Sequence, residues 1–338
     1  MKREYKALRQ QTFTIGKYSI VPIRYEDRFD IMDWRNVQLY HLRQNTTLTP
    51  VLQDKYFKNV INKLFKLDEP GQILFSYLED NICIGYGGLV HINWTDKNAE
   101  ISFLMNTQRE NNEFGKHWKI FLYLIEKAAF EVLSLHKVFT YAFDLRPHLY
   151  SILESSGFIN EAVLKDHCYY LDSYKDVVIH SKIDDGIKIR KISTEDADLI
   201  FKWSNEKTTR DNSFNSNLIE YKDHKSWFSR KLNDNNSAYF IGEIDNTPVA
   251  FIRFDIDIEK ITVGISIDKE YRGRKLSIAF LSKGSDIIST LYNLPIIAYI
   301  KKSNLPSVNA FKKAGFFYSK DILINGIESY EYKYDNNK

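Results

Sequence analysis

The sequence contains a long internal repeat. Residues 23–36 read IRYEDRFDIMDWRN and residues 192–205 read ISTEDADLIFKWSN, with six identical positions at a constant spacing of 169 residues. A second match closes each half, LESSGF at 153–158 and FKKAGF at 311–316. A repeat of this length is too long for a solenoid unit and about right for a domain. The chain of 338 residues is therefore predicted to fold as two related domains, each with its own core.

The composition bears on the classes of partner. With 47 basic and 44 acidic residues the net charge is +3, so neither a nucleic acid nor a membrane partner is indicated. The start of the chain, MKREYKALRQQTF, lacks an apolar run, and no segment is long enough to cross a bilayer. Cys83 and Cys168 have no metal-ligand spacing and are interpreted as reduced core residues. We expect a cytoplasmic protein without a metal site.

Hydrophobic periodicity predicts the same order of elements in both halves. In the first half the predicted strands are 18–24, 73–79, 82–92, 99–105, 138–144, 158–170 and 177–182, and the predicted helices cover about 26–34, 54–66, 116–133 and 147–157. In the second half the strands are 187–192, 238–243, 247–257, 260–267, 295–301, 316–322 and 327–334, with helices at 194–204, 221–232, 274–291 and 305–314. The hydrophilic step at 181–186 is the candidate linker. This pattern indicates an α+β fold in each half.

A basic turn in the second half, EYRGRKLS at 270–277, carries the sharpest local signal. It lies between a predicted strand and a predicted helix, where free backbone N–H groups and the positive end of the helix dipole face outward. Two arginines and a lysine add charge, so a phosphate or pyrophosphate is the natural ligand. An ordinary solvated turn before a helix is the alternative.

This second half resembles the GNAT superfamily of acyl-CoA-dependent N-acetyltransferases, whose loop after the fourth strand has the pattern Arg/Gln-x-x-Gly-x-Gly/Ala. The resemblance implies that the loop binds the pyrophosphate of acetyl-CoA, the co-substrate. The residues it assigns to the cofactor are Ile267, Arg272, Gly273, Arg274, Lys275, Leu276 and Ser277. Lys275 stands where a glycine is usual, and Ser277 replaces the last small residue.

The segment SNLPSVNAFKKAGFF at 303–317 is similar to a second motif of the family, N-x-x-S-x-x-x-[FY]-x-x-x-G-F. The resemblance implies that Asn304 and Ser307 lie beside the pantetheine arm of the cofactor. A tyrosine often occupies the position of Phe311 and protonates the leaving thiolate. Because phenylalanine has no proton to give, that role is vacant or filled by another residue.

Residues 203–232 look like the GNAT branch that acetylates nucleotide-activated amino sugars, which carries W-R-N-x-x-x-x-R-x-x-S followed by H-x-x-W-F. The residues that would hold the acceptor are Arg210, Asn212, Ser213 and Asn215, the arginine through a phosphate and the others through hydroxyl groups. His224 is either a candidate base, because its ordinary pKa lies near neutrality, or a solvated helix residue. Trp203 and Trp227 are interpreted as core residues.

The first half also resembles a GNAT domain, and its tail at 129–183 is similar to the ribosomal-protein and antibiotic acetyltransferase branch. The resemblance implies that Glu100 acts as a base through a water, with an exposed strand glutamate as the alternative. Gly264 is the expected counterpart of Glu100 in the second half. The matching pyrophosphate loop at 108–118 carries Glu110 and Glu113, two carboxylates that would repel phosphate.

The sequence thus predicts two tandem GNAT domains, residues 1–183 with a degenerate pyrophosphate loop and residues 187–338 with the acetyl-CoA loop retained. Each domain is expected to be a central, mostly antiparallel mixed sheet of about seven strands flanked by about four helices. The favoured activity is acetyl transfer to a primary amine, an amino sugar on a nucleotide carrier in surface-glycan biosynthesis. Two alternatives stay open: acetylation of a protein N-terminus or small amine, and a non-catalytic acyl-CoA-binding or interaction module. The sequence gives no oligomeric state.

Overall fold

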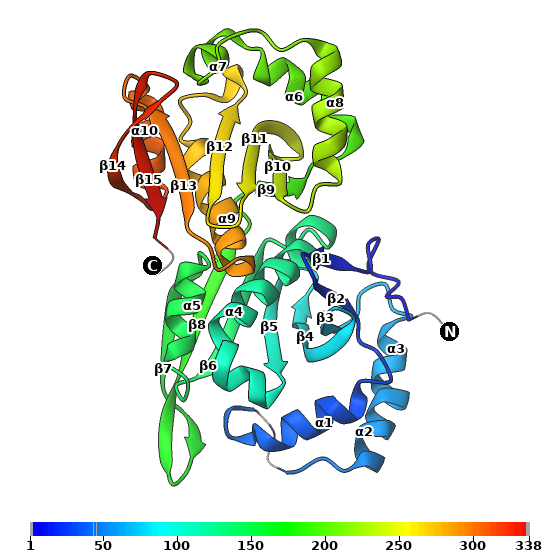
Figure 1. Ribbon diagram of the computed structural model, residues 1–338. Helices are drawn as coiled ribbons and strands as arrows, with labels where there is room; N and C mark the ends of the chain where they lie inside the picture. The colour runs from blue at the N-terminus through cyan, green and yellow to red at the C-terminus, as the bar shows by residue number, and fades with distance from the viewer. Residues whose placement is uncertain (1–2, 43, 45, 336–338) are drawn as a thin grey trace. The chain divides into compact units, whose positions relative to one another are not determined.

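The structure, a computed structural model, describes residues 3–42, 44 and 46–335. The chain divides into two compact units, unit 1 at Met1–Asp184 and unit 2 at Asp185–Lys338. Figure 1 shows each unit as a twisted sheet with helices packed against it. In the described part, no helix combines the length and apolar composition needed to span a bilayer.

Unit 1 is built on an eight-stranded sheet. Its strands are β1 (Phe13–Ile15), β2 (Tyr18–Pro22), β3 (Gln72–Glu79), β4 (Ile82–Asn93), β5 (Asn98–Met105), β6 (Lys137–Phe143), β7 (Ile159–Tyr170) and β8 (Ser173–Ile183). Its helices are α1 (Arg28–Val37), α2 (Pro50–Tyr56), α3 (Asn62–Leu64), α4 (Thr107–Glu126) and α5 (His148–Ser155), with π-helical turns at Phe57–Ile61 and Lys127–Val132. The sheet order is β1-β2-β3-β4-β5-β6-β8-β7.

Unit 2 repeats this plan with seven strands. They are β9 (Ile187–Lys191), β10 (Ser237–Ile244), β11 (Thr247–Ile256), β12 (Ile261–Ile267), β13 (Ile296–Lys301), β14 (Phe316–Ile324) and β15 (Ile327–Tyr334). The helices are α6 (Ala197–Ser204), α7 (Lys207–Asn212), α8 (Tyr221–Leu232), α9 (Leu276–Leu291) and α10 (Leu305–Lys313), and a short 3-10 turn at Lys269–Tyr271 precedes α9. The sheet order is β14-β15-β13-β12-β11-β10-β9.

The same two-residue turn sets the register of the central hairpin in both units. Asp80 and Asn81 join β3 to β4, and Asp245 and Asn246 join β10 to β11, all four with φ between 46° and 67°. Such left-handed residues form the tight turn that matches the twist of a hairpin, and Asp and Asn tolerate this conformation better than most residues. The turn therefore fixes which side chains of β4 and β11 face each side of the sheet.

In each unit the sheet opens at its parallel pair of strands. β12 and β13 are paired only at Ile261 with Ile296 and at Thr262 with Ile297, and beyond these pairs the ladder stops. β5 and β6 likewise pair over three residues, 98–100 with 137–139. We call residues 263–267 and 298–301 the open segment of unit 2. Because the carboxyl ends of adjacent parallel strands meet at one edge, the loops that follow β12 and β13 lie at the mouth of this opening.

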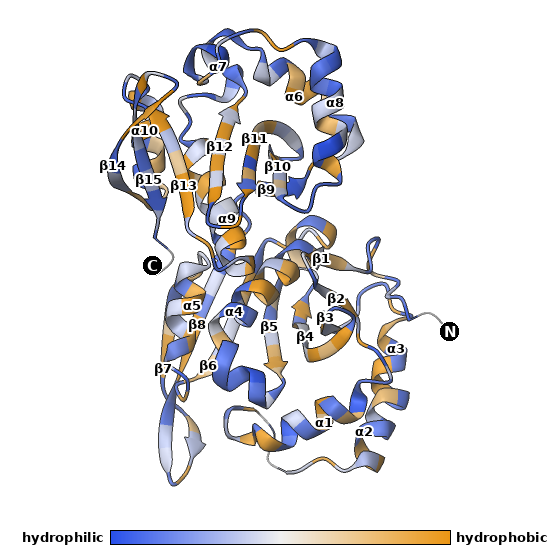
Figure 2. Cartoon of the chain, in the orientation of Figure 1, coloured by the Kyte–Doolittle hydropathy of each residue, from blue (hydrophilic) through white to orange (hydrophobic). Residues whose placement is uncertain are grey.

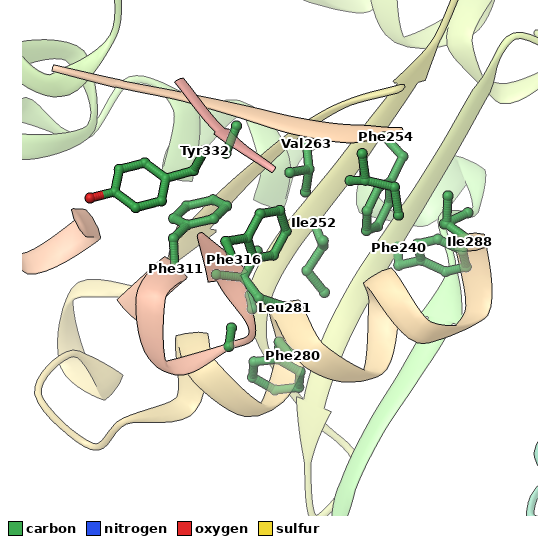
Figure 3. Packing of buried hydrophobic residues seen from close by; sticks show 14 of the residues in the cluster. Phe240, Ile252, Phe254, Val263, Phe280, Leu281, Ile288, Phe311, Phe316 and Tyr332 are labelled. Atoms are coloured by element: carbon green, nitrogen blue, oxygen red, sulfur yellow. The ribbon is translucent and has the colours of Figure 1, made fainter. Parts of the chain in front are cut away.

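The two faces of the unit 2 sheet are covered by different helices. On one face Phe280 and Leu281 of α9 pack with Ile252 and Phe254 of β11 in the larger core (Figure 3). On the other face a smaller cluster joins residues of α6 and α8 to β10 and β11, namely Ile200, Trp203, Phe228, Tyr239, Ile241 and Phe251. In Figure 2 the central strands are the most hydrophobic elements, as expected for a sheet covered on both sides.

The predicted fold class is confirmed, and most predicted elements are present with ends shifted by a few residues. Two short elements, β1 and α7, were not predicted, because segments of three to six residues show too little hydrophobic periodicity. The prediction of a loop at 108–118 is wrong, because α4 begins at Thr107 and includes this segment, with a kink at Glu113. Cys83 and Cys168 are free thiols that are partly buried rather than core residues.

Candidate functional site at the open edge of unit 2

The basic turn predicted from the sequence lies at the mouth of the open segment. It connects the end of β12 at Ile267 to the start of α9 at Leu276, and residues 272–275 are all exposed. The guanidinium of Arg274 lies 4.9 Å from the centre of the Tyr271 ring and donates to the Glu270 carbonyl at 3.3 Å. This geometry leaves a cationic, solvent-facing loop directly before a helix N-terminus.

The backbone of this turn explains why the family pattern prefers glycine at the position of Lys275. Gly273 has φ 79° and Lys275 has φ 62°, so both are left-handed. A residue with a Cβ adopts this conformation at a cost of roughly 1 kcal/mol or more. Lys275 also serves as the N-cap of α9 without any side-chain capping bond. The helix N-terminus is therefore uncapped by side chains, the state in which its N–H groups are open to an anion.

Arg272 is held by an acidic residue of the α7 segment. Its Nη2 lies 2.7 Å from Oε2 of Glu206, and its Nε donates to the Ile267 carbonyl at 3.1 Å. The hydrogen bond from Arg272 lowers the pKa of Glu206 to about 2. The same Oε2 accepts the Thr209 N–H at 3.1 Å, so Glu206 is also the N-cap of α7. One carboxylate thus joins the cofactor-loop arginine to α7.

The second motif occupies the neighbouring strand end. Asn304 is the N-cap of α10, and its Oδ1 accepts the Ser307 N–H at 3.2 Å. Phe311 is buried at 3% exposure against Phe316, with ring centres 4.9 Å apart, as Figure 3 shows. Asn304, Ser307 and the basic turn therefore share one edge of the sheet, while Phe311 belongs to the core. The cofactor role of Asn304 and Ser307 stays a prediction.

The four residues predicted to hold the acceptor lie together on α7 and the loop after it, but their side chains hydrogen-bond to residues of this same segment. Arg210 donates to the carbonyls of Asn215 and Asn217 at 3.3 and 3.2 Å and to Oγ of Ser213 at 3.0 Å. Asn212 donates to the Thr208 carbonyl at 2.9 Å. The guanidinium of Arg210 is therefore engaged by its own loop.

His224 and Trp203 both hold helix α6 in place, His224 from helix α8 and Trp203 through the end of β12. His224 is 2% exposed, stacks on Phe228, and has Nε2 2.7 Å from the Ala197 carbonyl, which is the geometry of a helix-packing residue. Its proposed role as a base stays a prediction. Trp203 donates through Nε1 to Oδ2 of Asp268 at 2.7 Å, and so joins α6 to the residue that directly follows β12.

The corresponding edge of unit 1 is closed by its own residues. Asn106 caps α4, its Oδ1 accepting the N–H groups of Gln108 and Arg109 at 3.0 and 3.3 Å. Behind this cap, Glu110 and Arg146 form an ion pair at 3.0 Å with side chains only 10% and 13% exposed. Burial raises the pKa of Glu110, although the charge of Arg146 opposes the shift. In unit 1 the buried carboxylate of Glu110 thus lies at the edge that is equivalent to the one where unit 2 carries its basic turn.

Glu100 faces the side of the unit 1 sheet away from α4. Phe103 stacks on Phe121 of α4, and alternation along β5 places Glu100 on the opposite face. It is 8% exposed, and its Oε2 lies 2.8 Å from Nδ1 of His91. Its role as a base stays a prediction.

The prediction that Gly264 is the counterpart of Glu100 is wrong by two residues. In unit 1, Glu100 pairs with Val90 across β4 and with Phe139 across β6. In unit 2 the equivalent ladder position is Thr262, which pairs with Asp255 and Ile297. Gly264 instead corresponds to Ser102. Sequence comparison alone missed this because the loops before the two strands differ in length.

Sequence reasoning also missed the roles of Glu206 and Arg146, which bear on these sites through contacts distant in the chain. The partner of Arg272 is 66 residues away, and the partner of Glu110 is 36 residues away. Only an opposite charge in another segment hints at such a pair. Among the described residues, no group of three or more His, Cys, Asp or Glu side chains is arranged to hold a metal ion.

In both units the sheet opens between one pair of parallel strands, at the same topological position. Two family models match the chain, each described as an acetyltransferase (GNAT) domain, one over residues 20–179 and the other over residues 187–317. The chain belongs to the GNAT acetyltransferases and carries two such domains in tandem. It is an N-acetyltransferase by class, and enzymes of this class generally take the acetyl group from acetyl-CoA.

Comparison with solved structures finds proteins of similar fold at low sequence identity. No curated protein matches the chain significantly. A spermidine/spermine N-acetyltransferase, SpeG from Vibrio cholerae, is 17% identical over 49% of this chain and 94% of that chain, with a TM-score of 0.42. An uncharacterized protein from Bacillus halodurans is 20% identical over 45% of this chain and 84% of that chain, with a TM-score of 0.39. At these values the likeness carries no argument about the acceptor.

Proposed function

We propose that unit 2 binds acetyl-CoA and transfers its acetyl group to a primary amine. The observation that carries this proposal is the exposed turn at 272–275, with two left-handed residues, before a helix that no side chain caps. Such a turn presents N–H groups, the positive helix end and arginines to a pyrophosphate. Asn304 and Ser307 lie at the adjacent strand end, so the pantetheine arm would run along the open segment at 263–267.

The reaction proposed is direct attack of a neutral amine on the thioester. The amide bond forms, the C–S bond breaks, and CoA leaves as the thiol with the proton that the amine gives up. Backbone N–H groups left without a ladder partner along the open segment would polarise the thioester carbonyl. Holding amine and thioester together supplies the remaining rate advantage. The favoured acceptor is an amino sugar on a nucleotide carrier, because the loop at 210–215 resembles the branch that acetylates such sugars.

Unit 1 fits the cofactor less well, because its helix α4 is capped by Asn106 and its edge is filled by the Glu110–Arg146 pair. We therefore place the cofactor in unit 2, and propose a supporting role for unit 1. Acetylation of a protein N-terminus or small amine by unit 1 stays an alternative, carried by the buried carboxylate of Glu100.

Calorimetric titration of the full chain with acetyl-CoA tests the cofactor site. We expect binding of one equivalent, and at least tenfold weaker binding when Arg272 and Arg274 are both changed to Ala, because charged hydrogen bonds contribute about 1.5–3 kcal/mol each. Changing Arg230, an exposed arginine of α8, together with Lys222 to Ala removes the same charge elsewhere in unit 2 and serves as the control. Unchanged affinity in the Arg272/Arg274 variant refutes this site. A thiol-release assay with UDP-, dTDP- and CMP-linked amino sugars, peptides and polyamines then identifies the acceptor.

A further inference from the structure

The face of the unit 2 sheet that carries α6 and α8 holds a cation that the proposed cofactor site does not use. Arg253 lies in β11, a strand paired on both sides, yet its side chain is exposed. Ile252 and Phe254 belong to the core beneath α9, so Arg253 points to the opposite face, where Phe251 packs with α6 and α8. Central-strand positions are usually covered, so an exposed arginine there marks an uncovered part of this face.

Arg253 has no internal partner to explain its position. No hydrogen bond or ion pair joins its guanidinium to another residue in the part of the chain that the structure describes. By contrast Arg210, Arg272 and Arg190 are each engaged by oxygen atoms of their neighbours. A free guanidinium held on a rigid strand is well placed to bind an anion from solution.

Gly264 makes the space in which Arg253 lies. A Cβ added at Gly264 would come within 2.7 Å of Nε of Arg253, a distance that real Cβ contacts do not show. The φ of Gly264 is not in the left-handed region, so the backbone conformation does not require glycine here. The missing side chain instead leaves room for Arg253. The guanidinium therefore lies over β12, within the residues of the open segment where the thioester is proposed to sit.

The charges around Arg253 leave this face positive. The charge of Arg253, after burial, contributes to lowering the pKa of Arg210, so the two guanidinium groups lie near each other. Lys301 of β13 donates to the Asp211 carbonyl at 2.7 Å and adds a third cation close to α7. Asp255, the nearest acid on β11, is already bonded by Tyr239 and paired with Lys231.

We propose that Arg253 binds a phosphate group of the acceptor, so that unit 2 selects amines that carry a phosphate over neutral and polycationic amines. The inference rests on the proposed acetyltransferase function and adds to it the residue that would bind the phosphate of the acceptor. A guanidinium matches the geometry of phosphate through two parallel hydrogen bonds. The same positive face would repel a polyamine, because like charges brought together in a partly desolvated site cost free energy. Arg253, rather than the internally bonded Arg210, is then the specificity residue.

The test compares acetylation of glucosamine 1-phosphate, glucosamine and spermidine by the full chain. We expect kcat/KM for the phosphate-bearing amine to exceed that for glucosamine at least tenfold, and Arg253→Gln to abolish this preference. Arg253→Lys should keep part of it. Gly264→Ala should weaken it as well, because the new Cβ displaces the guanidinium. Arg230→Gln, which removes an exposed charge from α8, should leave the preference intact.

Two readouts separate failure of this inference from failure of the proposed function. The affinity for acetyl-CoA should be the same in the wild type and in Arg253→Gln. If the wild type does not bind acetyl-CoA, the proposed function is refuted, but the inference about Arg253 is not. In that case, calorimetric binding of glucosamine 1-phosphate to the full chain without CoA still tests Arg253, and this binding should weaken at least tenfold in Arg253→Gln. A preference for glucosamine or spermidine, a phosphate preference that survives Arg253→Gln, or no binding of glucosamine 1-phosphate overturns the inference.

Discussion

At the scale of single residues, Lys275 has a strained backbone conformation in the basic turn of unit 2. Its φ of 62° places a lysine in a conformation that glycine adopts without strain. Its side chain is exposed, and therefore adds charge at the mouth of the open segment. The lysine that departs from the family pattern thus keeps the backbone shape for which the pattern usually selects glycine.

Changing Lys275 to Gly should raise the unfolding free energy of unit 2 by about 1 kcal/mol or less, because relief of left-handed strain is partly offset by the greater flexibility of glycine in the unfolded chain. Thermal unfolding of the full chain measures this. Lys269→Gly, in the preceding 3-10 turn, is the control and should stabilise nothing, since Lys269 is absent from the positive-φ residues. Destabilisation by Lys275→Gly would show that the lysine side chain supports the turn.

At the scale of elements, α7 is attached at both ends to the mouth of the open segment. Its N-cap Glu206 pairs with Arg272 after β12, and its Asp211 carbonyl accepts a hydrogen bond from Lys301 at the end of β13. A pyrophosphate that binds Arg272 must compete with Glu206, and the carboxylate repels it. The state of α7 is therefore linked to cofactor binding.

Changing Glu206 to Gln should tighten acetyl-CoA binding severalfold, because it frees Arg272 and removes a nearby negative charge. The amide oxygen can still cap α7. Calorimetry measures the affinity, and Glu220→Gln, an exposed residue before α8, is the charge-matched control. Equal or weaker binding by the Glu206 variant contradicts the competition.

The same variant should change the pH dependence of stability. The pKa of Glu206 falls from an ordinary 4.5 to about 2 in the fold, so its stabilising contribution is present above pH 4.5 and is lost as the pH falls toward 2. This contribution should be about 1 kcal/mol or less, because the pair is partly exposed. Unfolding of unit 2 measured between pH 2 and pH 6 should therefore show a shallower acid slope in Glu206→Gln.

In unit 1 the element that closes the edge is the first part of α4. Arg146→Ala should destabilise unit 1 by about 3 kcal/mol, because it leaves Glu110 buried without its partner. Replacing both Glu110 and Arg146 with Leu should recover much of this loss, since an apolar pair requires no charge burial. Urea unfolding of the full chain measures both changes. A small effect of Arg146→Ala would show that water reaches Glu110.

At the scale of the whole molecule, the two units share a topology but present different edges. Hydrogen exchange of the full chain with and without acetyl-CoA should show new protection at 272–278 and 304–308. Residues 106–112 should show no change, because the start of α4 is already capped by Asn106. Protection at 106–112 would place a cofactor in unit 1 as well, and would contradict the division of roles proposed for the two units.

The sequence by itself determined the repeat, the fold class, most elements and the position of the basic turn, because periodicity, turn residues and short motifs are local properties of the chain. It could not determine that 108–118 is helical, since a cap and a kink decide where α4 begins. Pairs such as Glu206 with Arg272 and Glu110 with Arg146, and the space above Gly264, depend on segments far apart in the chain. Only the tertiary structure decided them, because charge and volume act through distance in space.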